Sequence, residues 1–372
     1  MNITLDLKSF RADERMALSL RAIYESYGYR PYKMSKFEEY ELYSSNIDFL
    51  GDGGVLTFTD VNGKLMALKP DVTLSIVKNS KGSVGTQKVH YRENVYRRNA
   101  RGGSFKEMLQ SGIECIGNIG TVETVEVLLL ALKSLSATEC SYRLDISHIG
   151  VLSSLIGDDI AGEIKDELFT CIKRKNAGGI IEIATVNDLD IKRFEALAYA
   201  VSLNGNALDV IASLKEIPYL SACEGLNELT EIITALNSLG YKENIGIDLS
   251  VVNDMNYYRS LIFRGYIDCV PEGILFGGRY DDLVKKMGRN CGALGFAVAL
   301  DRLQDLAKVN YGDDNALLVY DENMSPSEIM NAADGIRKNG YSVEITSDKE
   351  KSSGFRKVFY ITQNGVTEDE NA

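Results

Sequence analysis

The chain has 372 residues, of which 45% are hydrophobic and 25% charged, and its formal net charge is −12 at pH 7. This length predicts two or three domains and a core large enough to fold without metal or disulfide staples. Because phosphate groups are bound mostly by lysine and arginine, the acidic balance favours small ligands or protein partners over nucleic acid.

The N-terminus and the cysteines predict a cytoplasmic protein without a membrane segment. Charged residues come too early for a signal peptide, and the longest apolar run, residues 127–132, is core-sized rather than membrane-spanning. The six cysteines show no CxxC or CxxH spacing, and the chain has only two histidines. We therefore expect reduced, buried thiols and no metal site.

The first predicted elements lead to a polar strand exit. They are a helix at residues 12–28 and a hairpin at residues 55–58 and 65–68, around the turn DVNG. In the following LKPDVT, Pro70 stops the strand and leaves Asp71 and Thr73 at its exit. These two polar residues either line a site or belong to an ordinary Pro-Asp turn.

Residues 90–117 predict an antiparallel hairpin, with extended segments on both sides of the polar connector NARGGS. Because side chains alternate across a strand, Gln110, Gly112 and Glu114 share one face. Two interpretations stay open. Arginines of the partner strand, such as Arg97, would hold a small zwitterion together with the Gln and Glu. Alternatively, Arg and Glu only pair across the strands, for roughly 0.2 to 1 kcal/mol per pair.

The rest of the chain predicts three regions. Residues 1–151 and 241–310 form strands and helices of one α+β core, and residues 152–240 form a helical insertion between its halves. Residues 311–372 form a small C-terminal α/β domain with three strands, one helix and an acidic tail. Further predicted elements are a helix at 122–135, a strand at 142–147 that leads to His148, and strands at 245–252, 256–267 and 273–284.

The hairpin and the later stretches GGRYDDLV and GALGFAVALDRL resemble class II aminoacyl-tRNA synthetases, most closely histidyl-tRNA synthetase. The family's second motif is matched by Tyr96, Arg97, Gln110, Gly112 and Glu114, and its third by Gly295, Phe296, Ala297, Leu300, Asp301 and Arg302. LKPDVT resembles the family's L-R-P-(E/D)-x-T. The resemblance implies an antiparallel sheet of six or seven strands flanked by helices.

One departure from the family concerns its histidine-specific motif R-G-L-D-Y-Y, whose arginine helps to activate the amino-acid carboxylate against ATP. This chain has Asn253 at the place of that arginine but keeps Tyr257 and Tyr258. Loss of a preorganised charge at a reacting phosphate costs on the order of 10² to 10³ in rate, so we expect no adenylation. The segment after residue 314 also looks too short for a full anticodon-binding domain, and we expect no tRNA partner.

These features are similar to the histidyl-tRNA-synthetase-like regulatory subunits of ATP phosphoribosyltransferase. The resemblance implies a non-catalytic chain that the short-form catalytic subunit needs for activity, in a hetero-octamer that contains a homodimer of this chain. Histidine would be the feedback inhibitor of this first step of histidine biosynthesis. The alternative is a divergent histidyl-tRNA synthetase that activates histidine with ATP.

The resemblance also places the site residues. It implies that the polar contacts of histidine are Asp71, Thr73, Arg97, Gln110 and Glu114, and that the walls are Tyr257 and Tyr258. Arg302 is either a remnant of the nucleotide site or a structural ion-pair partner. We expect no cofactor.

Overall fold

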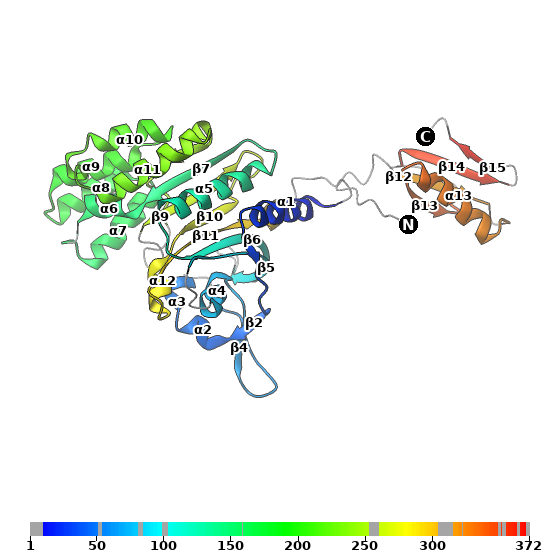
Figure 1. Ribbon diagram of the computed structural model, residues 1–372, viewed down its shortest axis with the longest axis horizontal. Coiled ribbons are helices and arrows are strands. Elements are labelled where there is room, and N and C mark those ends of the chain that lie inside the picture. Colours follow the sequence, from blue (N-terminus) through cyan, green and yellow to red (C-terminus); the bar gives the residue numbers. More distant parts are fainter. Residues whose placement is uncertain are drawn as a thin grey trace. The chain divides into compact units, whose positions relative to one another are not determined.

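A computed structural model describes residues 10–50, 54–80, 85–98, 103–157, 159–252, 260–303, 315–321, 323–348, 351, 355–362 and 365–369. The chain divides into two compact units, Asp13–Gln304 and a second one that combines Met1–Ala12 with Asp305–Ala372 (Figure 1). None of the helices within the described residues is long and apolar enough to cross a membrane.

The larger unit is built on an eight-stranded mixed sheet with the order β1-β5-β6-β11-β10-β9-β7-β8. The strands are β1 (Arg30–Pro31), β5 (Gln87–Arg98), β6 (Phe105–Gly117), β7 (Tyr142–His148), β8 (Ile245–Ile247), β9 (Leu261–Ile267), β10 (Leu275–Arg279) and β11 (Gly292–Ala299). The class II synthetase-like fold is confirmed. The expectation of an antiparallel sheet with six or seven strands is wrong in two respects. The sheet has eight strands, and it is mixed because the short edge strands β1 and β8 pair in parallel with β5 and β7.

Helices α1 (Ala12–Ser26) and α5 (Thr121–Ser136) pack on one face of this sheet. Tyr24 of α1 is fully buried; its hydroxyl lies 3.0 Å from Ser134 Oγ of α5, and its ring meets Phe296 of β11 edge-on at 6.0 Å. A Cβ at Gly265 of β9 would lie 2.8 Å from Leu135, so α5 packs directly on that backbone. Ile113 of β6 pairs with Phe296 and therefore projects towards these helices. Because side chains alternate along a strand, the next residue, Glu114, projects from the opposite face.

A separate three-stranded sheet, which comes before β5 in the chain, has the order β2-β4-β3. Its strands are β2 (Phe37–Glu39), β3 (Thr57–Thr59) and β4 (Leu65–Leu68), and the helices around it are α2 (Tyr40–Ser44), α3 (Ile47–Leu50) and α4 (Thr73–Asn79). The predicted hairpin of residues 55–68 is confirmed. After β4, the buried Lys69 pairs with Glu93 of β5, and its carbonyl accepts from Tyr96 N at 2.9 Å. These bonds hold the strand exit against the β5–β6 hairpin.

Six helices follow β7: α6 (Ile149–Ile156), α7 (Gly162–Lys173), α8 (Ala177–Val186), α9 (Ile191–Ser202), α10 (Ala207–Lys215) and α11 (Glu224–Ser238). Side chains cap several of them, as when Asp190 Oδ1 accepts from Lys192 N at 3.1 Å. His148 caps α6 through Nδ1, which accepts from Gly150 N at 3.1 Å. Its Nε2 lies 3.2 Å from Glu228 Oε2 of α11. The boundaries of the insertion, 152 and 240, remain a proposal.

Two cysteines depart from the expectation of reduced thiols. Cys140 and Cys269 form a disulfide, because they flank β7 and β9, which pair with Tyr142 opposite Ile267. Their sequence separation of 129 residues gives no hint of this contact. Within the described residues, the group with metal-ligand geometry consists of Asp268 and these two bonded cysteines. The free cysteines are Cys115 and Cys223, which are buried, and Cys171 and Cys291, which are partly buried.

The C-terminal unit contains β12 (Asn315–Tyr320), α13 (Pro326–Lys338), β13 (Ser342–Thr346), β14 (Lys357–Thr362) and β15 (Gly365–Glu368). The sheet order is β13-β12-β14-β15, and β12 pairs in parallel with both of its neighbours. Helix α13 begins at a capping box of Ser325 and Glu328. The expectation of a frayed acidic tail from residue 367 onwards is wrong for Thr367 and Glu368. These two residues belong to the fourth strand, β15, which is antiparallel to β14.

Candidate functional site

Glu114 of β6 is the centre of a buried polar cluster. It lies opposite Gly295 of β11, and its side chain is folded over that glycine, where a Cβ would lie 1.9 Å from Glu114 Oε2. Only glycine therefore fits at position 295. Thr73 Oγ1 donates to Glu114 Oε1 at 2.7 Å, and the Tyr280 hydroxyl donates to Oε2. Tyr280 follows β10, so three separate segments meet at one carboxyl group.

The surroundings favour the neutral form of this carboxyl group. Burial raises the pKa of Glu114 to about 8, and the nearby Asp71 charge acts in the same direction, while the hydrogen bonds from Tyr280 and Thr73 oppose the rise. Near neutral pH the carboxyl group is therefore largely protonated in the free protein. A cationic ligand group that replaces this proton would gain a buried carboxylate as its partner.

Asp71 and Arg97 form the second part of the cluster. Arg97 Nη2 lies 3.1 Å from Asp71 Oδ2, and Arg97 Nε donates to Pro70 O at 2.7 Å. Asp71 Oδ1 accepts from Leu74 N in the first turn of α4 at 3.0 Å. Burial raises the pKa of Asp71, and Arg97 opposes that rise. The charge of Arg97 is thus already matched by a carboxylate.

Tyr91 fills the space over Gly112. A Cβ on Gly112 would lie 2.6 Å from the Tyr91 hydroxyl oxygen and 2.2 Å from Phe296 O, so the glycine admits the protein's own tyrosine. Burial raises the pKa of Tyr91, and the charges of Glu114 and Asp71 add to this effect.

Four of the residues predicted from the sequence come together in this cluster: Asp71, Thr73, Arg97 and Glu114. Gln110 lies on the same face of β6, opposite Glu93 of β5. Asn253, Tyr257 and Tyr258 lie outside the residues that the structure describes. Sequence reasoning missed Tyr91 and Tyr280. The position of Tyr280 two residues after the paired glycines of GGRYDD was the available signal.

Arg302 has partners of its own. Its Nη2 lies 3.1 Å from Glu272 Oε2, Nη1 donates to Gly273 O, and the guanidinium lies 5.4 Å from the ring centroid of Phe276. Of the two roles expected for Arg302, these contacts match that of a structural ion-pair partner. A nucleotide would have to displace the Glu272 carboxylate to use this cation.

Known proteins share this fold and sequence pattern. A family model described as histidyl-tRNA synthetase matches residues 4–303. The chain is 30% identical over 341 residues, 88% of each chain, to the ATP phosphoribosyltransferase regulatory subunit of Caldanaerobacter subterraneus subsp. tengcongensis. A solved structure from Bacillus halodurans, described as an ATP phosphoribosyltransferase regulatory subunit/histidyl-tRNA synthetase, superposes with a TM-score of 0.77 at 25% identity, over 94% of this chain and 93% of that one.

The ATP phosphoribosyl transferase (HisG:HisZ) complex from Thermotoga maritima contains a chain with the same fold. Its TM-score is 0.62 at 20% identity, over 80% of this chain and 98% of that one. The family model spans most of the chain, and the Caldanaerobacter relative matches it over nearly its full length. The chain therefore belongs to the histidyl-tRNA synthetase family, among the ATP phosphoribosyltransferase regulatory subunits.

Proposed function

We propose that this chain binds histidine and passes its signal to a short-form ATP phosphoribosyltransferase catalytic subunit, which needs the chain for activity. The observation that carries the proposal is the buried, hydrogen-bonded cluster of Thr73, Glu114 and Tyr280 on a synthetase-like fold. In the sequence, Asn253 stands where the synthetases have the arginine that assists adenylation. Binding without activation is what a sensor of histidine requires.

The chemistry of the pocket suits a small zwitterion. Asp71 and Glu114 offer carboxylates to an amine or an imidazole N–H, and Thr73 and Gln110 offer neutral hydrogen-bonding groups. Tyr257 and Tyr258 are the proposed walls, and Arg97 completes the polar set. Histidine bound here inhibits only through a difference in its affinity for two states of the complex.

We infer the assembly from the relatives. The names of the curated relatives and the solved Thermotoga maritima complex support a partnership with a catalytic subunit. A homodimer of this chain within a cytoplasmic hetero-octamer is the arrangement that we propose. It makes this chain a regulatory protein of the first step of histidine biosynthesis.

Mixing this protein with a short-form catalytic subunit is expected to raise its phosphoribosyl transfer rate well above that of the catalytic subunit alone. Histidine should then lower the rate of the mixture, because its site lies on this chain. The measurement is the formation of phosphoribosyl-ATP, with and without histidine. A rate unchanged by the added protein would contradict the regulatory assignment. Activation without inhibition by histidine would contradict only the sensor role.

The purified protein alone is expected to catalyse no histidine-dependent exchange between pyrophosphate and ATP. Adenylation needs cations at the reacting phosphate, and here Arg97 and Arg302 are each bound to a carboxylate of the protein. Exchange of labelled pyrophosphate into ATP measures the activity directly, with a histidyl-tRNA synthetase as the positive control. Robust exchange would favour the alternative, a divergent histidyl-tRNA synthetase.

A further inference from the structure

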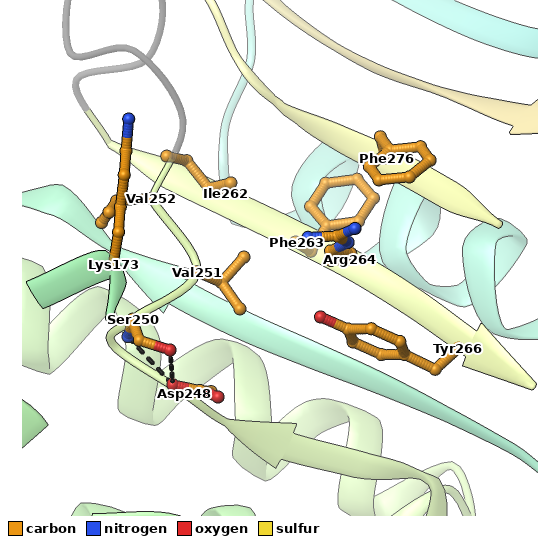
Figure 2. A pocket seen from close by; sticks show the side chains of 10 residues that line it. All are labelled: Lys173, Asp248, Ser250, Val251, Val252, Ile262, Phe263, Arg264, Tyr266 and Phe276. Carbon is orange, nitrogen blue, oxygen red and sulfur yellow. Dashed lines mark hydrogen bonds between the residues drawn. The ribbon is translucent and has the colours of Figure 1, made fainter. Parts of the chain in front are cut away.

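A pocket of about 200 Å³ lies between β9 and the segment that follows β8 (Figure 2). Its floor consists of side chains from β9 and β10, and its side consists of the segment that follows β8. The lining residues are Lys173, Asp248, Ser250, Val251, Val252, Ile262, Phe263, Arg264, Tyr266 and Phe276. Figure 2 shows the guanidinium of Arg264 between the rings of Phe276 and Tyr266. The pocket therefore has two cationic lining residues, Lys173 and Arg264, and Arg264 is the one that lies among aromatic rings.

Arg264 lacks an anionic partner within the described part of the chain. Its Nε is buried without a hydrogen-bond partner and packs against Gly273, where a Cβ would lie 2.6 Å from it. Its guanidinium lies 4.9 Å from the Phe276 ring centroid and 5.4 Å from that of Tyr266. Ring faces attract a cation but do not satisfy its N–H groups. A buried guanidinium N–H without an acceptor costs free energy that an anionic ligand would recover.

The carboxylates near Arg264 are already engaged with other groups. Asp145 lies opposite Arg264 in the β7–β9 pair, but it binds Arg143 Nε at 2.6 Å. Asp248 lines the pocket, but it accepts from Ser250 Oγ at 2.6 Å and pairs with Lys175 at 2.8 Å. Among the described residues, Arg264 is therefore left as a position that could bind an anion.

Arg264 projects from the same face of the sheet as Glu114. Residues paired directly across strands project to the same side of a sheet. Glu114 pairs with Gly295, Gly295 with Gly278, and Gly278 with Ile262, which lies two residues before Arg264 on β9. Arg264 and Glu114 thus project from one face. Of the two strands between them, β10 has no side chain at Gly278 in that row, and at Gly295 of β11 the row is covered by the Glu114 side chain itself.

We propose that Arg264 binds the α-carboxylate of the amino acid whose amine or imidazole contacts the Glu114 cluster. This inference rests on the proposed histidine site and adds the residue that distinguishes an amino acid from its carboxylate-free analogues. Arg97 fits this role less well because Asp71 already holds its guanidinium at 3.1 Å. Arg264 brings a positive charge that no described carboxylate pairs with, and a planar fork that matches a carboxylate.

Calorimetry with histidine and with histidinol, in which an alcohol replaces the carboxylate, tests this assignment. Arg264→Gln is expected to lower the histidine affinity by about tenfold to a hundredfold, the usual range for a lost charge-assisted hydrogen bond. The histidinol affinity should change by less than about twofold, since histidinol brings no anion to this position. Arg264→Lys, which keeps the charge but not the fork, should lie between the wild type and Arg264→Gln.

Arg302→Gln is the matched control, because Arg302 contacts the same Phe276 ring but is bound to Glu272. It should keep the wild-type ratio of histidine to histidinol affinity. An unchanged histidine affinity in Arg264→Gln, or an equal loss for both ligands, would overturn the assignment. A third result would also overturn it: inorganic phosphate binds the wild type but not Arg264→Gln, whereas histidine binds both proteins. If wild-type protein binds no histidine at all, the histidine site itself fails.

Discussion

Glu114→Gln is expected to weaken histidine binding by at least about 30-fold, because removing the charged partner of a buried polar pair costs about 2 to 5 kcal/mol. Glutamine keeps the size of the side chain and still accepts from Thr73, but it cannot become a carboxylate when the ligand's cationic group arrives. Titration calorimetry measures the affinity. In buffers of different ionisation enthalpy it should also detect a proton released from Glu114 by the wild type and not by the variant.

Glu107→Gln is the matched control for this experiment. Glu107 lies on the same strand but its side chain projects from the other face, where it accepts from the Tyr96 hydroxyl at 3.0 Å. Its replacement should leave histidine affinity at the wild-type value. Glu114→Ala is a poorer test, since it leaves the hydroxyls of Thr73 and Tyr280 without their partner and costs about 1 to 3 kcal/mol of stability. Unchanged binding by Glu114→Gln would remove Glu114 from the site.

The same carboxyl group is expected to make the free protein less stable as pH rises. The folded pKa of Glu114 is about 8, against 4.5 for an ordinary glutamate, so between these values the folded state holds a proton that the unfolded state has lost. The stability from this proton is complete below the unfolded value and is lost as pH rises through the folded one. At about 1.4 kcal/mol per pKa unit, the effect is on the order of several kcal/mol.

Denaturant unfolding of the wild type and Glu114→Gln at a series of pH values measures this effect. The unfolding free energy of the wild type should fall between pH 4.5 and about 8, whereas that of the variant should fall less because its amide does not titrate. The raised pKa of Asp71 acts in the same direction in both proteins and cancels in the comparison. Equal slopes for the two proteins would show that Glu114 titrates normally.

The sequence predicted which side chains of β6 share the face that carries Glu114, because side chains alternate along a strand. Gln110, Gly112 and Glu114 follow from that rule, and the register of β6 agrees. The partner of Arg97 did not follow, because Arg97 lies opposite Lys106 across the hairpin and instead reaches Asp71 from the exit of β4. Both interpretations offered for the hairpin, a clamp for a zwitterion and an ion pair across the strands, therefore missed the contact between Arg97 and Asp71.

Contacts between distant segments were beyond sequence reasoning. Tyr280 reaches Glu114 only because β11 lies between β6 and β10, an order that no local pattern encodes. The Cys140–Cys269 disulfide depends in the same way on the pairing of β7 with β9. Arg264 looked like an ordinary strand residue until its neighbours were known. Side chains that share a face of one strand could therefore be predicted from the sequence, whereas contacts that depend on the order of strands in the sheet could not.

The bond between Glu228 and His148 ties helix α11 of the insertion to the end of β7. Glu228 of α11 also lies 3.6 Å from Arg279, the residue before Tyr280, and Gly225 passes so close to His148 that a Cβ there would lie 2.6 Å from Nδ1. Deleting the helices would leave a buried imidazole and a guanidinium without their shared carboxylate. Arg279 would keep Asp281 at 3.0 Å and His148 would keep Ser260 at 3.3 Å, so these side chains would lose their common link across the insertion but not every partner.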